Sequence, residues 1–223
     1  MERRFTDRGG MLWGCGVVFA AVGGVVLLGA TLRASAGSEA GSAALGYTME
    51  RAGGPHDFDY FEGAWTTRQR RLKARGVGST EWEEFPATLC MSRYLDGVAT
   101  VDEMWFPTKR WAGLTLRAFD LQKHQWSIYW ISSASGKLDA PVVGGFQGNR
   151  GEFYGEDRDG DRPVKVRFSW VKLDADHARW EQAFSYDDRT WETNWTADFV
   201  RADAGKVCLP SSSARPRHTA GPG

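Results

Sequence analysis

Apolar and polar side chains alternate along much of the chain between residues 56 and 202. The alternation is clearest in four segments: 114–118, 126–130, 164–170 and 191–199. A period of two places successive side chains on opposite faces of a β-strand. Turn-forming residues interrupt the pattern at 95–97, 106–108, 135–137, 147–149, 159–161 and 186–188. This spacing predicts about nine or ten antiparallel strands joined by short loops.

No stretch after residue 55 has the 3.6-residue period of an amphipathic helix. Successive hairpins with no helix to cover them leave exposed edge strands unless the sheet closes on itself. We therefore expect an all-β fold, a single antiparallel β-barrel, in preference to a two-sheet sandwich. Residues 56–61 would form a single helical turn that plugs one end of the barrel.

Residues 11–30 form an uncharged apolar run near the N-terminus. A helix of about 20 residues rises about 30 Å, which is the hydrocarbon thickness of a bilayer. Three arginines precede the run and only Arg33 follows it closely, so the positive-inside rule exports the rest of the chain. Small residues at 34–36 suit signal peptidase. These features predict an N-terminal apolar helix, with residues 1–36 acting as a signal peptide or a transmembrane anchor.

Met49 supports a second interpretation, because the segment that it begins reads like an ordinary cytosolic start. The protein is then cytoplasmic if translation starts at Met49, and otherwise exported or membrane-anchored with the barrel outside the cytoplasm. Small and polar residues at 37–55 predict a flexible linker, and those at 203–223 predict a disordered tail. The barrel domain is therefore expected over residues 56–202.

The charges balance, with 28 lysines and arginines against 28 aspartates and glutamates. A neutral chain argues against a nucleic-acid partner. The charge total averages a basic leader with a slightly acidic barrel, since residues 1–36 hold more arginines than acids. Three cysteines and eight prolines exclude disulfide-scaffold and collagen-like classes. The unusual feature is the aromatic content of 11 Trp, 12 Phe and 6 Tyr.

Gly63 and Trp65 resemble the Gly-x-Trp signature that opens the first strand of lipocalins and other calycins. In that superfamily the Trp closes the barrel floor, and a basic residue late in the last strand packs over it. The resemblance assigns these structural roles to Gly63, Trp65 and Arg201. A cation–π contact between Trp65 and Arg201 would tie the last strand to the first.

More of the chain, nearly all of residues 56–201, resembles a bacterial calycin-like family whose function is unassigned, a domain of unknown function. The motifs that carry this resemblance are residues 56–59, 63–65, 114–117, 126–130, 180–184 and 191–195. The resemblance implies a fold and no established activity. Members of the family mostly look cytosolic and lack an N-terminal apolar segment, which favours the start at Met49.

Polar residues among the aromatic strands are candidates for a small-molecule site, because binding cavities are mostly apolar with a few orienting polar groups. The ligand-binding candidates are Glu103, Arg117, Tyr129, Glu181, Gln182 and Asn194. Arg117 would be either a solvated residue of the outer face or the anion-binding group of the cavity. The alternative to a cavity is a barrel filled by its own aromatic side chains.

Two pairs of polar neighbours are also informative. Glu192 lies two residues from Asn194 and could orient its amide from the same strand face. Asp102 and Glu103 are adjacent, so they point to opposite faces and cannot act as an acid–base pair.

Metal and nucleophile motifs are missing from the sequence. The four histidines are scattered, and no Cys-x-x-Cys or Gly-x-Ser-x-Gly motif occurs, so neither a cofactor nor a metal is expected. In an exported chain, Cys90 and Cys208 could form a disulfide that stabilises the fold by about 4–5 kcal/mol. The alternative is a buried Cys90 thiol and a disordered Cys208.

Three functions therefore stay open. The leading hypothesis is a binding protein for a small, largely apolar molecule, without a nucleic-acid partner and with membrane attachment only through residues 11–30. The second is an enzyme of isomerase or hydrolase type that uses Arg117, Glu103 or Glu181. The third is a carbohydrate-binding or structural surface domain, which would use Trp82, Trp105 and Trp111 to stack on sugars.

Overall fold

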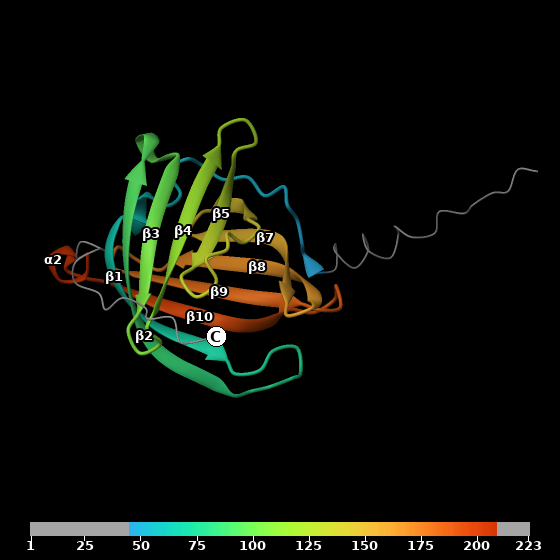
Figure 1. Ribbon diagram of the computed structural model, residues 1–223. Coiled ribbons are helices and arrows are strands. Elements are labelled where there is room, and N and C mark those ends of the chain that lie inside the picture. Colours follow the sequence, from blue (N-terminus) through green and yellow to red (C-terminus); the bar gives the residue numbers. More distant parts are fainter. Residues whose placement is uncertain (1–44, 209–223) are drawn as a thin grey trace, which may run out of the picture. The chain divides into compact units, whose positions relative to one another are not determined.

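Ten antiparallel strands form one closed barrel in the order β1-β10-β9-β8-β7-β6-β5-β4-β3-β2 in the computed structural model, which describes residues 45–208 (Figure 1). The strands are β1 (Gly63–Leu72), β2 (Trp82–Tyr94), β3 (Ala99–Phe106), β4 (Trp111–Asp120), β5 (Gln125–Ser132), β6 (Val142–Gln147), β7 (Arg150–Asp159), β8 (Arg162–Lys172), β9 (His177–Ser185) and β10 (Glu192–Arg201). The predicted antiparallel barrel is confirmed. The predicted N-terminal apolar helix at 11–30 lies outside the described residues.

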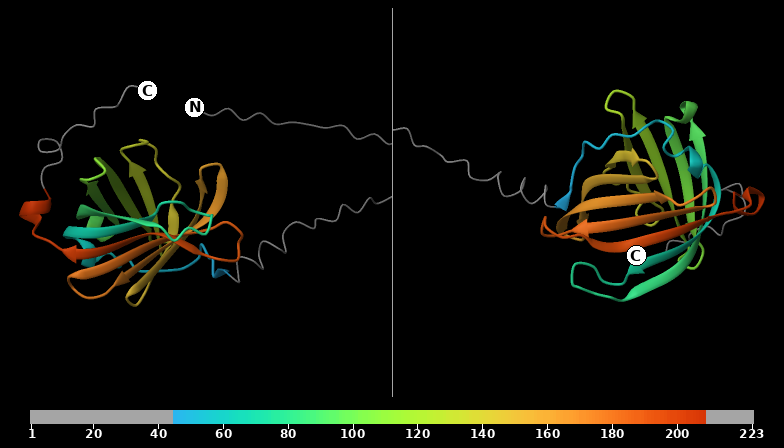
Figure 2. Two further views of the ribbon diagram at one scale, coloured as in Figure 1. Left: turned by 90° about the horizontal axis from the view of Figure 1, so that it is seen from below. Right: turned by 180° about the vertical axis from the view of Figure 1, so that it is seen from behind.

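The barrel closes because β1 pairs with a strand on each side. Trp65 lies opposite Leu89 of β2 and opposite Arg201 of β10. Closure gives every strand a neighbour on both sides, which is how a chain of hairpins avoids edge-to-edge association. In Figures 1 and 2, strands β3–β5 cross strands β8–β10 steeply, as the tilt of strands in a barrel requires.

The two ends of the barrel differ in what covers them. The 3-10 turn η1 (Asp59–Phe61) enters β1 at one end, which we call the closed end, where the short connections β2–β3, β4–β5, β6–β7 and β8–β9 also lie. The other end, the open end, carries the longer connections 73–81, 133–141 and 186–191. The predicted helical plug is confirmed, because Phe58 and Phe61 are both fully buried.

Aromatic side chains make up most of the core. The larger cluster fills the closed half of the barrel around Phe61, Trp65, Trp126 and Trp170. A smaller cluster around Phe85, Phe106 and Trp195 lies toward the open end. Most of the tryptophan and phenylalanine side chains in residues 45–208 therefore face the barrel interior, where each ring removes a large apolar area from water.

Residues 45–54, which we call the N-terminal strap, lie against the barrel wall at the weak β5–β6 junction, where only three residue pairs form (Figure 2). The Gly53 amide donates to the His124 carbonyl at 2.8 Å, and the Trp126 indole donates to the Gly54 carbonyl at 2.9 Å. A side chain on Gly145 would lie 2.4 Å from the Gly53 nitrogen, so the close approach requires glycine. The strap belongs to the predicted flexible linker but packs on the fold through these backbone atoms and through Arg51, which forms an ion pair with Glu152 at 2.7 Å. Composition alone does not reveal such contacts.

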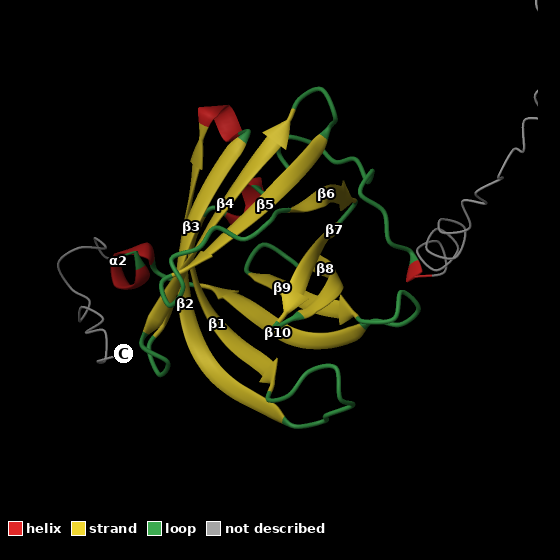
Figure 3. Cartoon of the chain, turned by 45° about the vertical axis from the view of Figure 1, so that its right-hand side comes forward, coloured by secondary structure: helices red, strands yellow, loops and turns green. Residues whose placement is uncertain are grey.

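The helix α2 (Ala204–Val207) follows β10 and lies beside β1 and β2 (Figure 3). The Asp203 carboxylate caps it by accepting a hydrogen bond from the Gly205 amide at 2.8 Å. Cys208 forms a disulfide with Cys90 of β2. Residues 203–208, expected in a disordered tail, are thus attached to the barrel. Within residues 45–208, no helix has the length and apolar character that crossing a bilayer requires.

Candidate functional site

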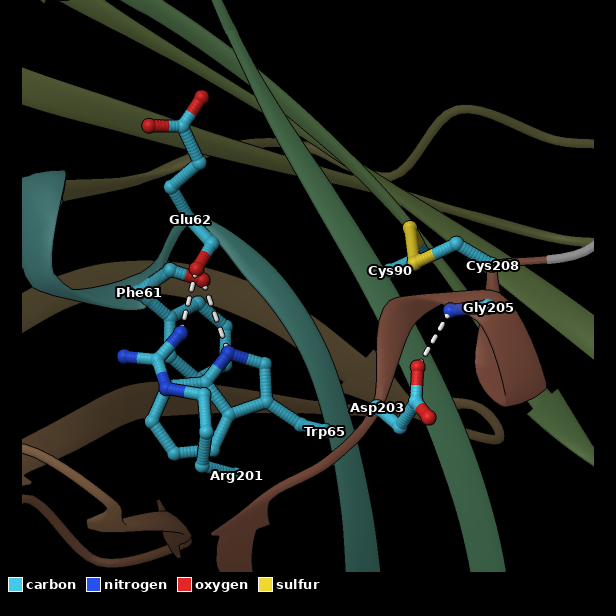
Figure 4. Close-up of a disulfide and its surroundings, with 8 residues drawn as sticks. All are labelled: Phe61, Glu62, Trp65, Cys90, Arg201, Asp203, Gly205 and Cys208. Carbon is cyan, nitrogen blue, oxygen red and sulfur yellow. Dashed lines mark hydrogen bonds between the residues drawn. A yellow bond between two sulfur atoms is a disulfide. The ribbon is translucent and has the colours of Figure 1, made fainter.

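The floor of the barrel is sealed at the closed end by Trp65 and Arg201. The Arg201 guanidinium lies 3.9 Å from the Trp65 ring centroid, which confirms the expected cation–π contact (Figure 4). Arg201 also donates to the carbonyls of Tyr60, Glu62 and Ala175, at 2.6, 2.5 and 3.1 Å. Tyr60 and Glu62 belong to the η1 turn and the residue after it, and Ala175 lies in the β8–β9 connection, so Arg201 joins both segments to the floor.

Above the floor lies a buried ion pair between Arg117 of β4 and Asp102 of β3. Each residue is 1% exposed, and Arg117 Nη1 donates to Asp102 Oδ2 at 2.5 Å. The guanidinium carbon lies 4.8 Å from the Phe58 ring centroid and 5.5 Å from that of Trp170. A buried ion pair with aromatic faces around its cation is neutral as a unit, so the cavity floor presents little net charge.

One polar atom of each residue in this ion pair makes no hydrogen bond within the described part of the chain. Asp102 Oδ1 and Arg117 Nε are buried and have no hydrogen-bond partner among the residues that the structure describes. An unmade hydrogen bond on a buried charged group is costly. A further polar group that reached these two atoms would recover that cost.

A cavity of about 290 Å³ extends from this pair toward the open end. Its walls are mainly apolar and aromatic, and include Trp130 of β5, Phe168 and Trp170 of β8, Trp180 of β9 and Trp195 of β10. The Trp180 ring lies 5.0 Å from Phe168 and 5.7 Å from Trp195, centroid to centroid. The aromatic side chains therefore line a space and do not fill it.

Two amides line the middle of the cavity with fixed orientations. Gln69 Oε1 accepts a hydrogen bond from the Trp195 indole at 2.8 Å, and Gln69 Nε2 donates to Thr67 Oγ1 at 2.7 Å. Gln182 Nε2 donates to Asn194 Oδ1 at 2.9 Å. Side chains that are held by second partners present their remaining polar atoms in a defined geometry.

Charged residues surround the mouth of the cavity. Arg71 and Arg75 lie on the β1 side, and Asp139, Asp157 and Asp159 lie on the side of β7 and the β5–β6 connection. Burial, followed by the charge of Arg75, lowers the pKa of Arg71. Burial, followed by the charge of Asp157, raises the pKa of Asp139. The mouth thus has arginines on the β1 side and mainly acidic residues, together with the exposed Arg158, on the β7 side.

The β1–β2 connection is held across part of this mouth. Arg75 forms an ion pair with Asp159 at 2.5 Å, and the Tyr186 hydroxyl donates to the same carboxylate at 2.8 Å. The Gly76 amide donates to the Glu192 carboxylate at 2.9 Å. Gly76 has φ +67° and lies so close to Tyr186 that a Cβ would be 2.8 Å from its ring, so a larger residue there would be strained.

Three of the predicted ligand-binding residues lie outside the cavity. Each of these stands on its strand between two neighbours that line the cavity, so its side chain points to the outer face. They are Glu103, Tyr129 and Glu181. Glu181 forms an ion pair with Arg179 at 2.8 Å on that face. The placement of Glu103 opposite Asp102 confirms that these two acids do not form a pair.

The other three predicted residues are brought together inside the barrel. Arg117 and Gln182 line the cavity, and Asn194 is fully buried behind Gln182. Arg117 is therefore an interior residue and not a solvated one. Asn194 is oriented by Gln182 and not by Glu192, because the β-bulge at Thr193–Trp195 shifts the register of β10.

Sequence reasoning did not single out Gln69, Arg71 or Asp102 as site residues. Their signal was present, since counting by two from Trp65 places Gln69 and Arg71 on the same face of β1.

The tryptophans proposed for sugar stacking do not share a surface. Trp82 lies under Arg70 on the outer face, at 5.0 Å from ring to guanidinium, whereas Trp111 packs on Phe106 at 4.1 Å.

Comparison with known proteins adds no functional assignment. No family model and no curated protein matches the chain. Among solved structures, the chain is similar to a redesigned β-barrel at 6% identity and a TM-score of 0.39, covering 66% of this chain and 96% of the other. That similarity is too low to carry an argument. Residues 45–208 hold no cluster of three or more metal-ligating side chains.

Proposed function

We propose that this protein binds a small, largely apolar molecule inside the barrel. The observation that carries the proposal is the aromatic-walled cavity of about 290 Å³ above a sealed floor. Small-molecule cavities measure roughly 300–1,000 Å³ and combine apolar walls with a few fixed polar groups. At about 290 Å³ this cavity lies at the lower limit of that range, which favours a small ligand.

The proposal predicts that cavity occupancy changes tryptophan fluorescence, because Trp130, Trp180 and Trp195 line the space. Titration with 1-octanol and octanoate provides two probes of equal chain length. Val166→Phe would fill the cavity from β8, and we expect it to weaken probe binding by about tenfold or more. Val200→Phe on the outer face of β10 is the matched control, and we expect it to change affinity by less than about twofold. Absence of saturable binding by either probe contradicts the proposal.

We further propose that the barrel is lipocalin-like. The contact of Trp65 with Arg201, at 3.9 Å from ring centroid to guanidinium, supports this relation because it joins the first and last strands as in that superfamily. A search with an alignment of relatives would test it: a Gly-x-Trp with a matching basic residue should recur in them.

We also propose that the barrel is exported or membrane-anchored. The Cys90–Cys208 disulfide supports this proposal, because disulfides persist in oxidising compartments. Leu45 and Tyr47 lie upstream of Met49 and contact the barrel, where the Leu45 carbonyl accepts from Trp191 at 2.8 Å. Mass spectrometry of the native N-terminus tests the proposal, and a first residue at Met49 would contradict it and favour the cytoplasm.

A further inference from the structure

Four arginines line the cavity: Arg71, Arg75, Arg117 and Arg158. Arg71 is partly buried and forms no ion pair among residues 45–208. Arg117 is paired with Asp102, and Arg75 is paired with Asp159. Arg158 is exposed to solvent and donates to the Asp161 carbonyl. Within residues 45–208, the side chain of Arg71 makes no hydrogen bond or ion pair, and its guanidinium lies over the face of Trp195, 4.6 Å from the ring centroid.

The nearest carboxylates are already engaged by other groups. Glu83 lies opposite Arg71 in the β1–β2 pairing, yet its carboxylate binds Lys109. Asp159 accepts from both Arg75 and Tyr186. The charges of Glu83 and Asp159 partly offset the lowering of the Arg71 pKa, but neither carboxylate forms an ion pair with Arg71 among residues 45–208. The guanidinium donors of Arg71 therefore stay available at the mouth of the cavity.

A partly buried guanidinium without a partner favours an incoming anion. Arginine stays protonated at any physiological pH, and its planar fork matches a carboxylate in two parallel hydrogen bonds. The Trp195 ring holds one face of the guanidinium, which limits its rotation and leaves its edge free to donate. Binding an anion would also relieve the cost of the unpaired charge.

We propose that Arg71 binds the head group of the ligand, and that the ligand is a small amphipathic monocarboxylate whose apolar body points toward the floor. This inference rests on the proposed binding function and specifies its ligand class. The head group lies at the mouth and not at Arg117, because the charge of Arg117 is matched by Asp102. Asp139 and Asp157 across the mouth repel an anion on their side, which favours the Arg71 side for the carboxylate. A dicarboxylate of equal length binds more weakly, because its second charge would be buried among apolar walls.

Octanoate and 1-octanol titrations of the purified protein test the inference, with Arg71→Gln as the test variant. We expect Arg71→Gln to weaken octanoate binding by about tenfold to a hundredfold, since a hydrogen bond to a charged group contributes about 1.5–3 kcal/mol. Binding of 1-octanol should change by less than about twofold. The control is Arg70→Gln, which removes the neighbouring arginine that stacks on Trp82 and pairs with Glu84 on the outer face. It should leave both affinities unchanged.

The outcomes separate the two proposals. If neither probe binds the native protein, the proposed function fails. If both bind and Arg71→Gln leaves octanoate binding unchanged, only the assignment of Arg71 fails. A circular-dichroism melt checks that the variant folds. If Arg71→Gln does not fold, the salt dependence of binding to the native protein tests the inference. Added salt should weaken octanoate binding, because it screens the ion pair, and should leave 1-octanol binding unchanged. Equal salt dependence for the two probes overturns the inference.

Discussion

Arg201 and Arg117 at the closed end each have several partners, whereas Arg71 at the open end rests on one aromatic ring. Arg201 contacts Trp65 and three backbone carbonyls, and Arg117 contacts Asp102 and the faces of Phe58 and Trp170. Arg71 makes no hydrogen bond or ion pair among residues 45–208, and its guanidinium lies over the face of Trp195. The same residue type therefore serves stability at one end and is free to serve recognition at the other.

This difference has a physical cause in the topology. At the closed end the plug formed by η1 brings backbone carbonyls and aromatic rings into the barrel, where a cation can satisfy them. At the open end the longer connections hold their own charges in pairs such as Arg75–Asp159. The comparison predicts that substitutions at the closed end lower stability, while those at the mouth mainly change binding.

The largest expected effect is at the buried pair. Asp102→Ala leaves the Arg117 charge buried without a partner, and we expect a loss of about 3–5 kcal/mol in the free energy of unfolding. The double variant Asp102→Leu with Arg117→Met removes both charges and should recover most of that loss. Urea unfolding measures both changes. A double variant as unstable as the single one would show that packing, and not the unpaired charge, sets the cost.

The disulfide at the outer side of β2 should have the next largest effect. Cys90 and Cys208 are separated by 118 residues. The chain-entropy model gives about 4–5 kcal/mol for a loop of this length, but disulfides typically contribute about 2–4 kcal/mol, which is the loss that we expect. Replacing Cys208 with Ser should lower the urea midpoint correspondingly. Free-thiol counting on denatured, unreduced protein provides the control. Two titratable thiols from Cys90 and Cys208 would exclude the bond.

Arg201→Met should cost about 2 kcal/mol, because it removes the cation–π contact and leaves carbonyls at the floor without their donor. Arg179→Met is a suitable control, since Arg179 makes its two ion pairs on the outer face of the barrel. Exposed ion pairs contribute at most about 1 kcal/mol, so the control should be near native. Equal destabilisation by the two variants would contradict the role of Arg201 at the floor.

The smallest effect is expected in the β9–β10 connection at the open end. The backbone amides of Arg189 and Thr190 lower the pKa of Asp187 from 3.8 to about 2. A lowered folded-state pKa stabilises the fold above the unfolded value, and this contribution is lost as the pH falls from about 4 to about 2. Melting temperatures of Asp187→Asn should thus lie below native values at pH 6 and converge with them near pH 2. A constant difference across that range would contradict the assignment.

The fold was largely predictable because the strand signal is local. The alternation in 114–118, 126–130, 164–170 and 191–199 marks segments of β4, β5, β8 and β10, although residue 191 precedes its strand. The pairing of Trp65 with Arg201 followed from family resemblance. The strap at 45–54 escaped prediction, because its contacts combine glycine backbone groups with the isolated side chains of Tyr47 and Arg51, which leave no periodic pattern in the sequence.

The cavity was harder to predict, since its polar residues act through neighbours that are distant in sequence. Asp102 lies on β3, and its importance depends on Arg117 of the next strand. The bulge in β10 moved Asn194 away from Glu192 and toward Gln182, which simple alternation cannot anticipate. Arg71 can be recognised as a candidate anion-binding residue only once the structure shows that Glu83, its neighbour across β1 and β2, binds Lys109 instead.

A crystal structure with 8-bromooctanoate tests the central claim most directly, because anomalous scattering locates the bromine without ambiguity. The carboxylate should lie on Arg71 at the open end, and the bromine should lie deep in the cavity near Leu89 and Val142. Bromine found only on the outer surface, or in the cavity with the carboxylate turned to Arg117, would contradict this account.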